Sequence, residues 1–137
     1  MAAYLDAILI GLINSISFPG LFIVIGATLI AMATSFLPGL GSASLMSLLL
    51  LLTLSWSQES ILLLFGALVG GATFMGSVTA ILFNIPGSPP NAAALLDGYP
   101  LARRGFPRTA IACAATASAV GSVIGVVVLL GLLPSLS

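Results

Sequence analysis

The chain has 137 residues, of which 60% are apolar and 4% are charged. An ordinary soluble domain carries about 25% charged residues, so this composition excludes a water-soluble monomer, and it is too apolar for a disordered chain. Histidine is absent, cysteine occurs once, and all positive charge comes from arginine. These facts exclude a histidine triad, a histidine metal site, a lysine Schiff base, a P-loop and an internal disulfide. We therefore expect no enzymatic activity.

The six charged residues leave three long uncharged runs, over residues 7–58, 60–96 and 109–137. A helix needs about 20 apolar residues to cross a hydrocarbon layer of roughly 30 Å, and each run provides at least that many. The sequence therefore predicts a protein of the lipid bilayer with an all-α fold. We expect one membrane domain over residues 1–137, with multi-pass helices and segments that are re-entrant or broken at Pro-Gly pairs.

Apolar runs and their Pro or Gly interruptions predict five hydrophobic helices, at approximately 3–17, 21–37, 44–56, 58–84 and 109–133. The first is short and either lies at the interface or crosses with a tilt, while the third is long enough for half a crossing. Ser57 is placed to cap the fourth helix, with Glu59 in its first turn.

Residues 88–108 form the single hydrophilic loop. Within it we predict two short helices, the first capped by Asn91 and the second opened by Pro100 and closed by Gly105. The dipeptide Asp97-Gly98 indicates a turn between them.

Small residues recur at four-residue spacing in the two longest helices, and Gly66, Gly70, Gly121 and Gly125 are the glycines of these ridges. Such ridges let helix backbones approach closely inside lipid, so we assign these four glycines to helix packing. Cys113 lies among alanines, and we expect it to be a small buried apolar residue.

Two Pro-Gly breaks are the candidate functional sites, since non-helical backbone in a membrane is tolerated where it is buried or lines a watery cavity. In transporters such breaks form the substrate site, with helix N-termini directed at anionic groups. The alternative is that each break only turns the chain at the bilayer surface. The candidate substrate-binding residues are Pro38, Gly39, Gly41 and Ser42 at the first break, and Asn84, Pro86, Gly87 and Ser88 at the second.

The three arginines, Arg103, Arg104 and Arg108, gather in the hydrophilic loop. A basic loop between spans indicates the cytoplasmic side, so we interpret them as a topology signal. A clamp on a substrate carboxylate is the alternative. Three arginines in one loop are too few for a nucleic-acid surface.

Three motifs resemble a known family: LPGLG at 37–41, GSVTAILFNIPG at 76–87 and LDGYPLARRG at 96–105. In order and spacing they are similar to the N-terminal part of the large membrane subunit of bacterial tripartite tricarboxylate transporters, the TctA type. The resemblance implies a multi-pass inner-membrane permease that imports tricarboxylates or related carboxylates, driven by a gradient of Na⁺ or H⁺. It also implies a small membrane subunit and a periplasmic solute-binding protein as partners, and no resident cofactor.

The resemblance covers about the N-terminal quarter of such a permease, whose members are built of two related halves. A carboxylate site between two repeats cannot be completed by part of one repeat, so we expect a fragment of a larger transporter. The alternative is a small membrane protein that transports nothing and assembles through its Gly/Ala ridges.

Overall fold

The computed structural model describes residues 2–36 and 42–132, apart from the side chains of residues 2–5 and 7, and its described part is helical without a strand. The helices are α1 (Ala2–Ile16), α2 (Phe18–Thr34), α3 (Ser42–Leu52), α4 (Gln58–Phe83), the 3₁₀ helix η1 (Pro89–Ala92), α5 (Ala93–Arg103) and α6 (Pro107–Leu132). The predicted all-α class is confirmed.

Two helices, α4 and α6, are each 26 residues long and apolar enough to cross a membrane. At 1.5 Å per residue each measures about 39 Å, more than the hydrocarbon thickness. A further crossing is available if α1 and α2 form one broken span, because the two helices meet at a bend of 74°. With α3 as a shorter apolar helix, the architecture is that of a multi-pass membrane protein with a broken segment.

The bend between α1 and α2 is built by Ser17, which caps α2 with its side chain. Its hydroxyl donates to the carbonyl of Asn14 at 2.6 Å and accepts from the N–H of Gly20 at 3.4 Å. Pro19 stands in the first turn, where its missing N–H costs no helical hydrogen bond. A side chain at Gly20 would overlap the carbonyl of Asn14, so the bend requires glycine there.

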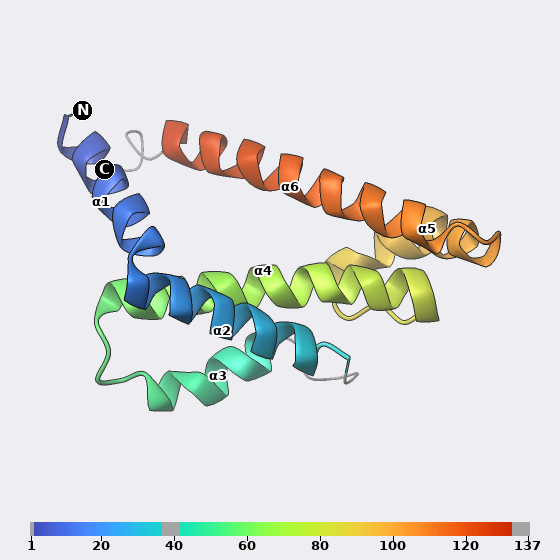
Figure 1. Ribbon diagram of the computed structural model, residues 1–137, viewed down its shortest axis with the longest axis horizontal. Helices are drawn as coiled ribbons and strands as arrows, with labels where there is room; N and C mark the ends of the chain where they lie inside the picture. The colour runs from blue at the N-terminus through green and yellow to red at the C-terminus, as the bar shows by residue number, and fades with distance from the viewer. Residues whose placement is uncertain (1, 37–41, 133–137) are drawn as a thin grey trace.

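The core lies between α2 and α4, which run side by side in the same direction, with α3 packed beneath them (Figure 1). Its buried residues are Ala27, Ala31, Leu64, Leu68 and Ala72. Small residues bring the two backbones together: a Cβ added at Gly71 would lie 3.0 Å from the carbonyl oxygen of Thr28. Close approach of small residues is the usual basis of helix association in lipid.

The four glycines assigned to helix packing take no part in the contact between α2 and α4. A Cβ added at Gly66, Gly70, Gly121 or Gly125 would meet nothing within 4 Å among the described residues. The contact with α2 is made by Gly71 instead of its neighbour Gly70. The packing role of these four glycines stays a prediction, and it now concerns contacts outside the described residues.

The predicted hydrophilic loop is largely helical, since η1 and α5 occupy most of it. Gly98 lies inside α5 and not in the predicted turn. Helix α5 packs so closely on α4 here that a Cβ at Gly98 would lie 2.7 Å from Cγ1 of the buried Ile81. Pro100 also lies inside α5 instead of opening a helix. Proline has no N–H to donate to the carbonyl of Leu96, one turn earlier. Leu96 is exposed, so this position tolerates the loss of one helical hydrogen bond. Gly105 ends this region with a φ of +95°, as the prediction requires.

The last helix, α6, packs against α5 and the end of α4 near its start and then diverges from the other helices (Figure 1). Ala110 in its first turns is buried, at 4% exposure, whereas the valines and most of the leucines further along are exposed. Cys113 is exposed within the described chain, which corrects the expectation of a buried residue. The reason is that Cys113 lines an open pocket between α6, α5 and Ile81 of α4, where these helices do not close over it.

Candidate functional site

The second Pro-Gly break begins where α4 ends, at Asn84. This residue caps the helix in the left-handed conformation, with φ 58° and ψ 29°, and its N–H donates to the carbonyl of Ala80 at 3.1 Å. Asparagine tolerates this conformation better than most residues. Pro86 and Gly87 then carry the chain away from the helix axis into η1.

The break is held against α4 by Asn91, a residue of η1 that is only 3% exposed. Its amide nitrogen donates to the Ser88 hydroxyl at 3.0 Å, and its amide oxygen accepts from the Ser77 hydroxyl of α4 at 3.0 Å. The Asn91 N–H also donates to the Ser88 carbonyl at 3.0 Å. Asn91 is therefore not a simple helix cap: it fastens the broken segment to the membrane helix before it.

Two glycines bring this segment into backbone contact with α4. A Cβ added at Gly87 would lie 2.7 Å from Cα of Gly76, and one added at Gly76 would overlap the amide nitrogen of Asn91. At Gly87 the obstacle is backbone, which cannot give way, so this position requires glycine. At Gly76 the obstacle is the Asn91 side chain, which is buried and hydrogen-bonded at both ends, so a side chain there would displace it. Sequence reasoning missed Gly76, Ser77 and Asn91 as site residues, although the Ser88-Pro-Pro-Asn91 spacing was a visible signal for a local side-chain bond.

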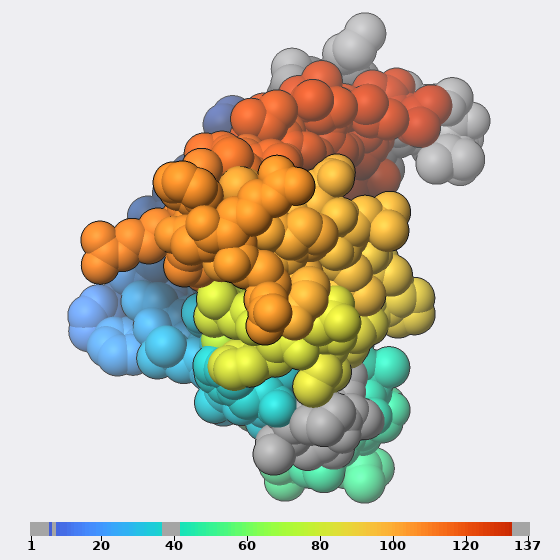
Figure 2. Space-filling model, turned by 90° about the vertical axis from the view of Figure 1, so that its right-hand side faces the viewer, coloured from blue at the N-terminus to red at the C-terminus, as the bar shows by residue number. Residues whose placement is uncertain are grey.

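A cavity of about 240 Å³ lies beside the break. Its walls combine the end of α2, the last turns of α4 and the break itself, through Ser35, Phe36, Thr79, Phe83, Ile85, Pro86 and Gly87. Figure 2 views this end of the molecule, with the last turns of α2 and α4 beside one another and α5 above them. Ser35 and Phe36 directly precede the LPGLG motif, so the second break lies beside the segment that leads into the first.

The predicted site residues are distributed unevenly around this cavity. Pro86 and Gly87 line it, Ser88 instead holds Asn91, and Asn84 is exposed and does not line it. Ser42 is the half-buried first residue of α3. Pro38, Gly39 and Gly41 lie outside the described residues.

Both hydroxyls of the cavity are buried, and each donates its proton inside its own helix. Ser35 Oγ donates to the carbonyl of Ala31 at 2.7 Å, and Thr79 Oγ1 donates to the carbonyl of Gly76 at 3.0 Å. Ser35 is 9% exposed and Thr79 is 6% exposed. Among the described residues, the helix ends at this cavity are the C-terminal ends of α2 and α4, whereas the sequence indicated helix N-termini.

The arginines are exposed and do not line this cavity. Arg103 ends α5, Arg104 caps it, and Arg108 lies in the first turn of α6. A cation at a helix C-terminus, such as Arg103, is favourable for the helix dipole.

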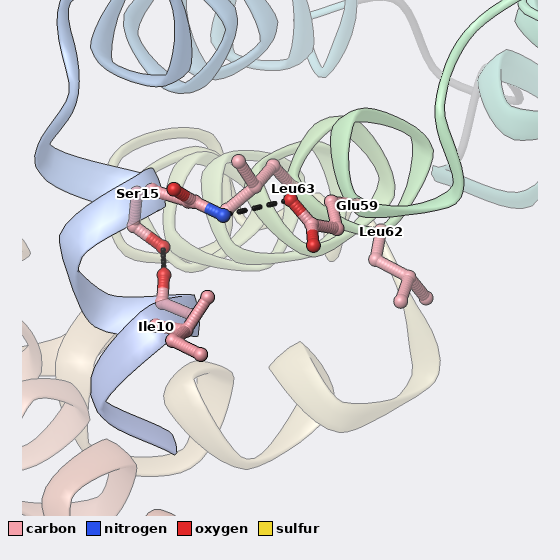
Figure 3. A pocket seen from close by; sticks show the side chains of 7 residues that line it. Ile10, Ser15, Glu59, Leu62 and Leu63 are labelled. Carbon is pink, nitrogen blue, oxygen red and sulfur yellow. Dashed lines mark hydrogen bonds between the residues drawn. The ribbon is translucent and has the colours of Figure 1, made fainter. Parts of the chain in front are cut away.

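A second cavity, of about 580 Å³, lies at the opposite end of α4, between α1 and the first turns of α4 (Figure 3). Its central polar contact is a hydrogen bond of 2.8 Å from the Asn14 amide to a carboxylate oxygen of Glu59. The predicted Ser57 cap and the place of Glu59 in the first turn are confirmed, whereas the Asn14 partner was not foreseen. The remaining walls are largely apolar: Ile10, Gly11, Ser15, Leu62 and Leu63.

Comparisons with known proteins agree with the resemblance in the sequence. A family model described as the tripartite tricarboxylate transporter TctA family matches residues 21–137. An Agrobacterium vitis protein, named "Uncharacterized 52.8 kDa protein in TAR-I ttuC' 3'region", is 39% identical over 82 residues, which are 60% of this chain but 16% of that protein. The matched part is thus about one sixth of the relative's length. No solved structure matches. Because the family model covers most of the sequence, the chain belongs to the tripartite tricarboxylate transporter TctA family.

Proposed function

We propose that this chain is the N-terminal part of the permease subunit of a tripartite transporter in a bacterial inner membrane. The transporter imports tricarboxylates or related carboxylates and is driven by a cation gradient. A periplasmic solute-binding protein delivers the carboxylate, and a small membrane subunit completes the complex. Membership of the TctA family supports the tripartite system, and the proposal adds the substrate, the driving ion and the partners.

The observation that carries this proposal is the cavity beside the second break. Irregular backbone in a membrane protein is tolerated where protein buries it or where it lines a watery cavity. The segment at Pro86 and Gly87 is exposed and lines the cavity, so it meets the second condition, and Asn91 holds the segment against α4. A segment that only reversed the chain at the bilayer surface would need neither the glycine contact at Gly76 nor a buried asparagine.

In this proposal the two breaks line the path of the substrate or of its cation. The chain enters the first break from Ser35 and Phe36 and leaves it into α3 at Ser42. Backbone N–H groups and the Ser42 hydroxyl at the start of α3 suit a carboxylate. In the proposal, the cavity beside the second break forms the neighbouring part of the same path. The remainder of the carboxylate site belongs to parts of the permease outside these 137 residues.

The test uses the complete permease with its two partner subunits, reconstituted into lipid vesicles with an inward cation gradient. Gly41→Leu alters the first break, and Gly87→Leu forces a side chain against the backbone of Gly76 at the second. We expect both variants to reach the membrane and to lose at least about tenfold in citrate uptake. Gly26→Leu in α2 is the matched control, since a Cβ there meets no described residue within 4 Å, and it should transport normally.

Normal uptake in both break variants would overturn the site assignment. A wild-type complex that transports no carboxylate under any cation gradient would overturn the proposed function itself.

A further inference from the structure

The three arginines lie together at the connection between α5 and α6, residues 103–108, which we call the basic tip. Arg103 is the last residue of α5, Arg104 caps that helix, and Arg108 is the second residue of α6. Gly105, with its φ of +95°, lets the chain turn between the two helices. The turn therefore gathers all the positive side-chain charge of the sequence within six residues.

The guanidinium groups of the basic tip have no partner within the described part of the chain. All three arginines are exposed, and none of their side chains forms a hydrogen bond or an ion pair with another described residue. Asp97, the acidic residue of α5, lies six residues before Arg103 and is not paired with it. The donors of the arginines are therefore not used to hold the described helices together, and they are available to an anion.

The basic tip lies at the end of a helix that is long enough to cross the membrane. Helix α6 has 26 residues, about 39 Å, whereas about 20 residues cross the hydrocarbon layer. Because its charged residue, Arg108, is in the first turn and its other end is apolar, the excess of about 9 Å falls at the start of the helix. The headgroup region on each side of the hydrocarbon is about 5–8 Å thick. The arginines therefore lie at the level of the lipid phosphates.

An exposed aromatic ring accompanies the arginines. Phe106 lies between them in the sequence and is 58% exposed. Figure 1 places the connection between α5 and α6 at the end of the molecule away from α1, and Figure 2 views this end with α5 on the near side. An aromatic ring beside cationic groups is typical of a membrane interface, where the ring enters the boundary of the acyl chains and the cations reach the phosphates. A water-soluble anion would use the arginines but leave the ring in water.

The charges of the molecule also select the kind of lipid. Glu59 lies in the first turn of α4, at the opposite end of the molecule from the basic tip (Figure 1). Positive charge in a loop marks the cytoplasmic side of a membrane protein. The cytoplasmic leaflet contains anionic lipids, and its negative surface potential attracts arginines close to the membrane. Charge complementarity therefore favours anionic over zwitterionic phospholipids at the tip.

We infer that the basic tip is a binding site for the headgroup of an anionic phospholipid of the cytoplasmic leaflet. Arg103, Arg104 and Arg108 bind the lipid phosphate, and Phe106 enters the boundary of the acyl chains. The site lies apart from the cavity beside the second break, whose walls contain no residue of the tip. It fastens the connection between α5 and α6 to the membrane surface and does not depend on which substrate or ion the transporter carries.

The test places the complete permease with its partner subunits in lipid nanodiscs that contain a photoreactive phospholipid. Phosphatidylglycerol and phosphatidylcholine carry the same photoreactive group close to the headgroup, their mole fractions are varied, and mass spectrometry of peptides locates the label. We expect phosphatidylglycerol to label residues 103–108 at a half-saturating mole fraction at least about tenfold below that of phosphatidylcholine. Arg103→Gln, Arg104→Gln and Arg108→Gln should each raise the half-saturating mole fraction of phosphatidylglycerol about fivefold.

Two control variants separate the loss of positive charge from other changes to the helix. Asp97→Asn removes an exposed charge from α5 outside the basic tip and should not weaken the labelling by phosphatidylglycerol. Arg104→Lys keeps the positive charge and should keep most of the labelling.

The inference is overturned if both lipids label the tip equally, or if the glutamine variants keep the preference of the wild type. Labelling by neither lipid would show that another part of the complex covers the tip, and would also overturn it. If citrate displaces phosphatidylglycerol more strongly than sulfate does at the same ionic strength, the arginines bind the carboxylate and the lipid inference is rejected. A complex that prefers phosphatidylglycerol at the tip but transports no carboxylate would keep the lipid site and reject the proposed function alone.

Discussion

Helices α4 and α6 have the same length and similar apolar character, yet their surroundings differ completely. Each has 26 residues and is rich in glycine and alanine. In the most apolar stretch of each helix, 33% of the residues of α4 are buried, whereas none of those of α6 is. Helix α4 contacts α2, α3, α5, η1 and the start of α6, while most of α6 has no described neighbour.

The difference teaches that a small-residue ridge does not by itself identify a helix contact. On α4, Gly71 and Gly76 are in contact with other segments, whereas Gly66 and Gly70 meet none of the described residues. Successive residues point about 100° apart around a helix, so neighbouring glycines can lie on different faces. By the same reasoning, the ridge of α6 identifies a face that is able to pack, and we expect its partner outside the described residues.

The largest expected effect contrasts two glycines of α4. Gly76→Leu would displace Asn91 and separate the break from α4, so we expect a loss of about 3 kcal/mol in stability and nearly all carboxylate uptake. Gly70→Leu places the same side chain where no described residue lies within 4 Å, so the break stays attached to α4, and we expect it to lose less stability and less uptake than Gly76→Leu. Thermal unfolding of the purified complete permease and its uptake in vesicles measure both effects. Equal losses in the two variants would show that the contacts of Gly76 do not hold the break.

Much of the fold follows from the sequence because it depends on local chemistry. Uncharged runs predict the membrane helices, Ser57 predicts the start of α4, and Pro86-Gly87 predicts its interruption. Each of these signals acts within a few residues, so one sequence is enough to interpret it. The short helices of the hydrophilic region were predicted less well, since the place of Gly98 depends on its contact with Ile81.

The site was predicted only in part because its geometry depends on contacts between distant segments. Nothing local to Ser35 or Thr79 indicates that they share a cavity, since they lie on different helices. Asn91 has the character of an ordinary loop or capping residue until Gly76 is found beside it. The direction of α2 and α4, which brings two C-termini together, is likewise a property of the packing and not of either segment.

The next effect tests the exposed helix. In the complete permease we expect Gly121→Leu and Gly125→Leu each to lower stability by about 1–3 kcal/mol, because a helix outside the described residues packs on this ridge and is overpacked by the new side chain. Gly131→Leu on the same helix lies off the ridge, and we expect little change. The unfolding temperature and the proportion of assembled complex on a sizing column are the measurements. If both leucine variants are as stable as the wild type, the ridge faces lipid and the prediction is wrong. Helix α6 would then differ from α4 in the complete permease as well.

The smallest expected effect concerns Asn84, which separates backbone geometry from substrate contact at the end of α4. Its left-handed conformation costs alanine about 1 kcal/mol, which asparagine partly avoids, so Asn84→Ala should lower stability slightly and reduce uptake a few-fold. Asn84→Gly adopts the same conformation freely and should keep uptake near the wild-type value. Initial uptake rates over a range of citrate concentrations distinguish the two roles. If the glycine variant loses uptake as the alanine variant does, with a raised half-saturating citrate concentration, the amide itself contacts the carboxylate. Because Asn84 is exposed and lies outside the walls of the cavity beside the second break, we expect the glycine variant to transport.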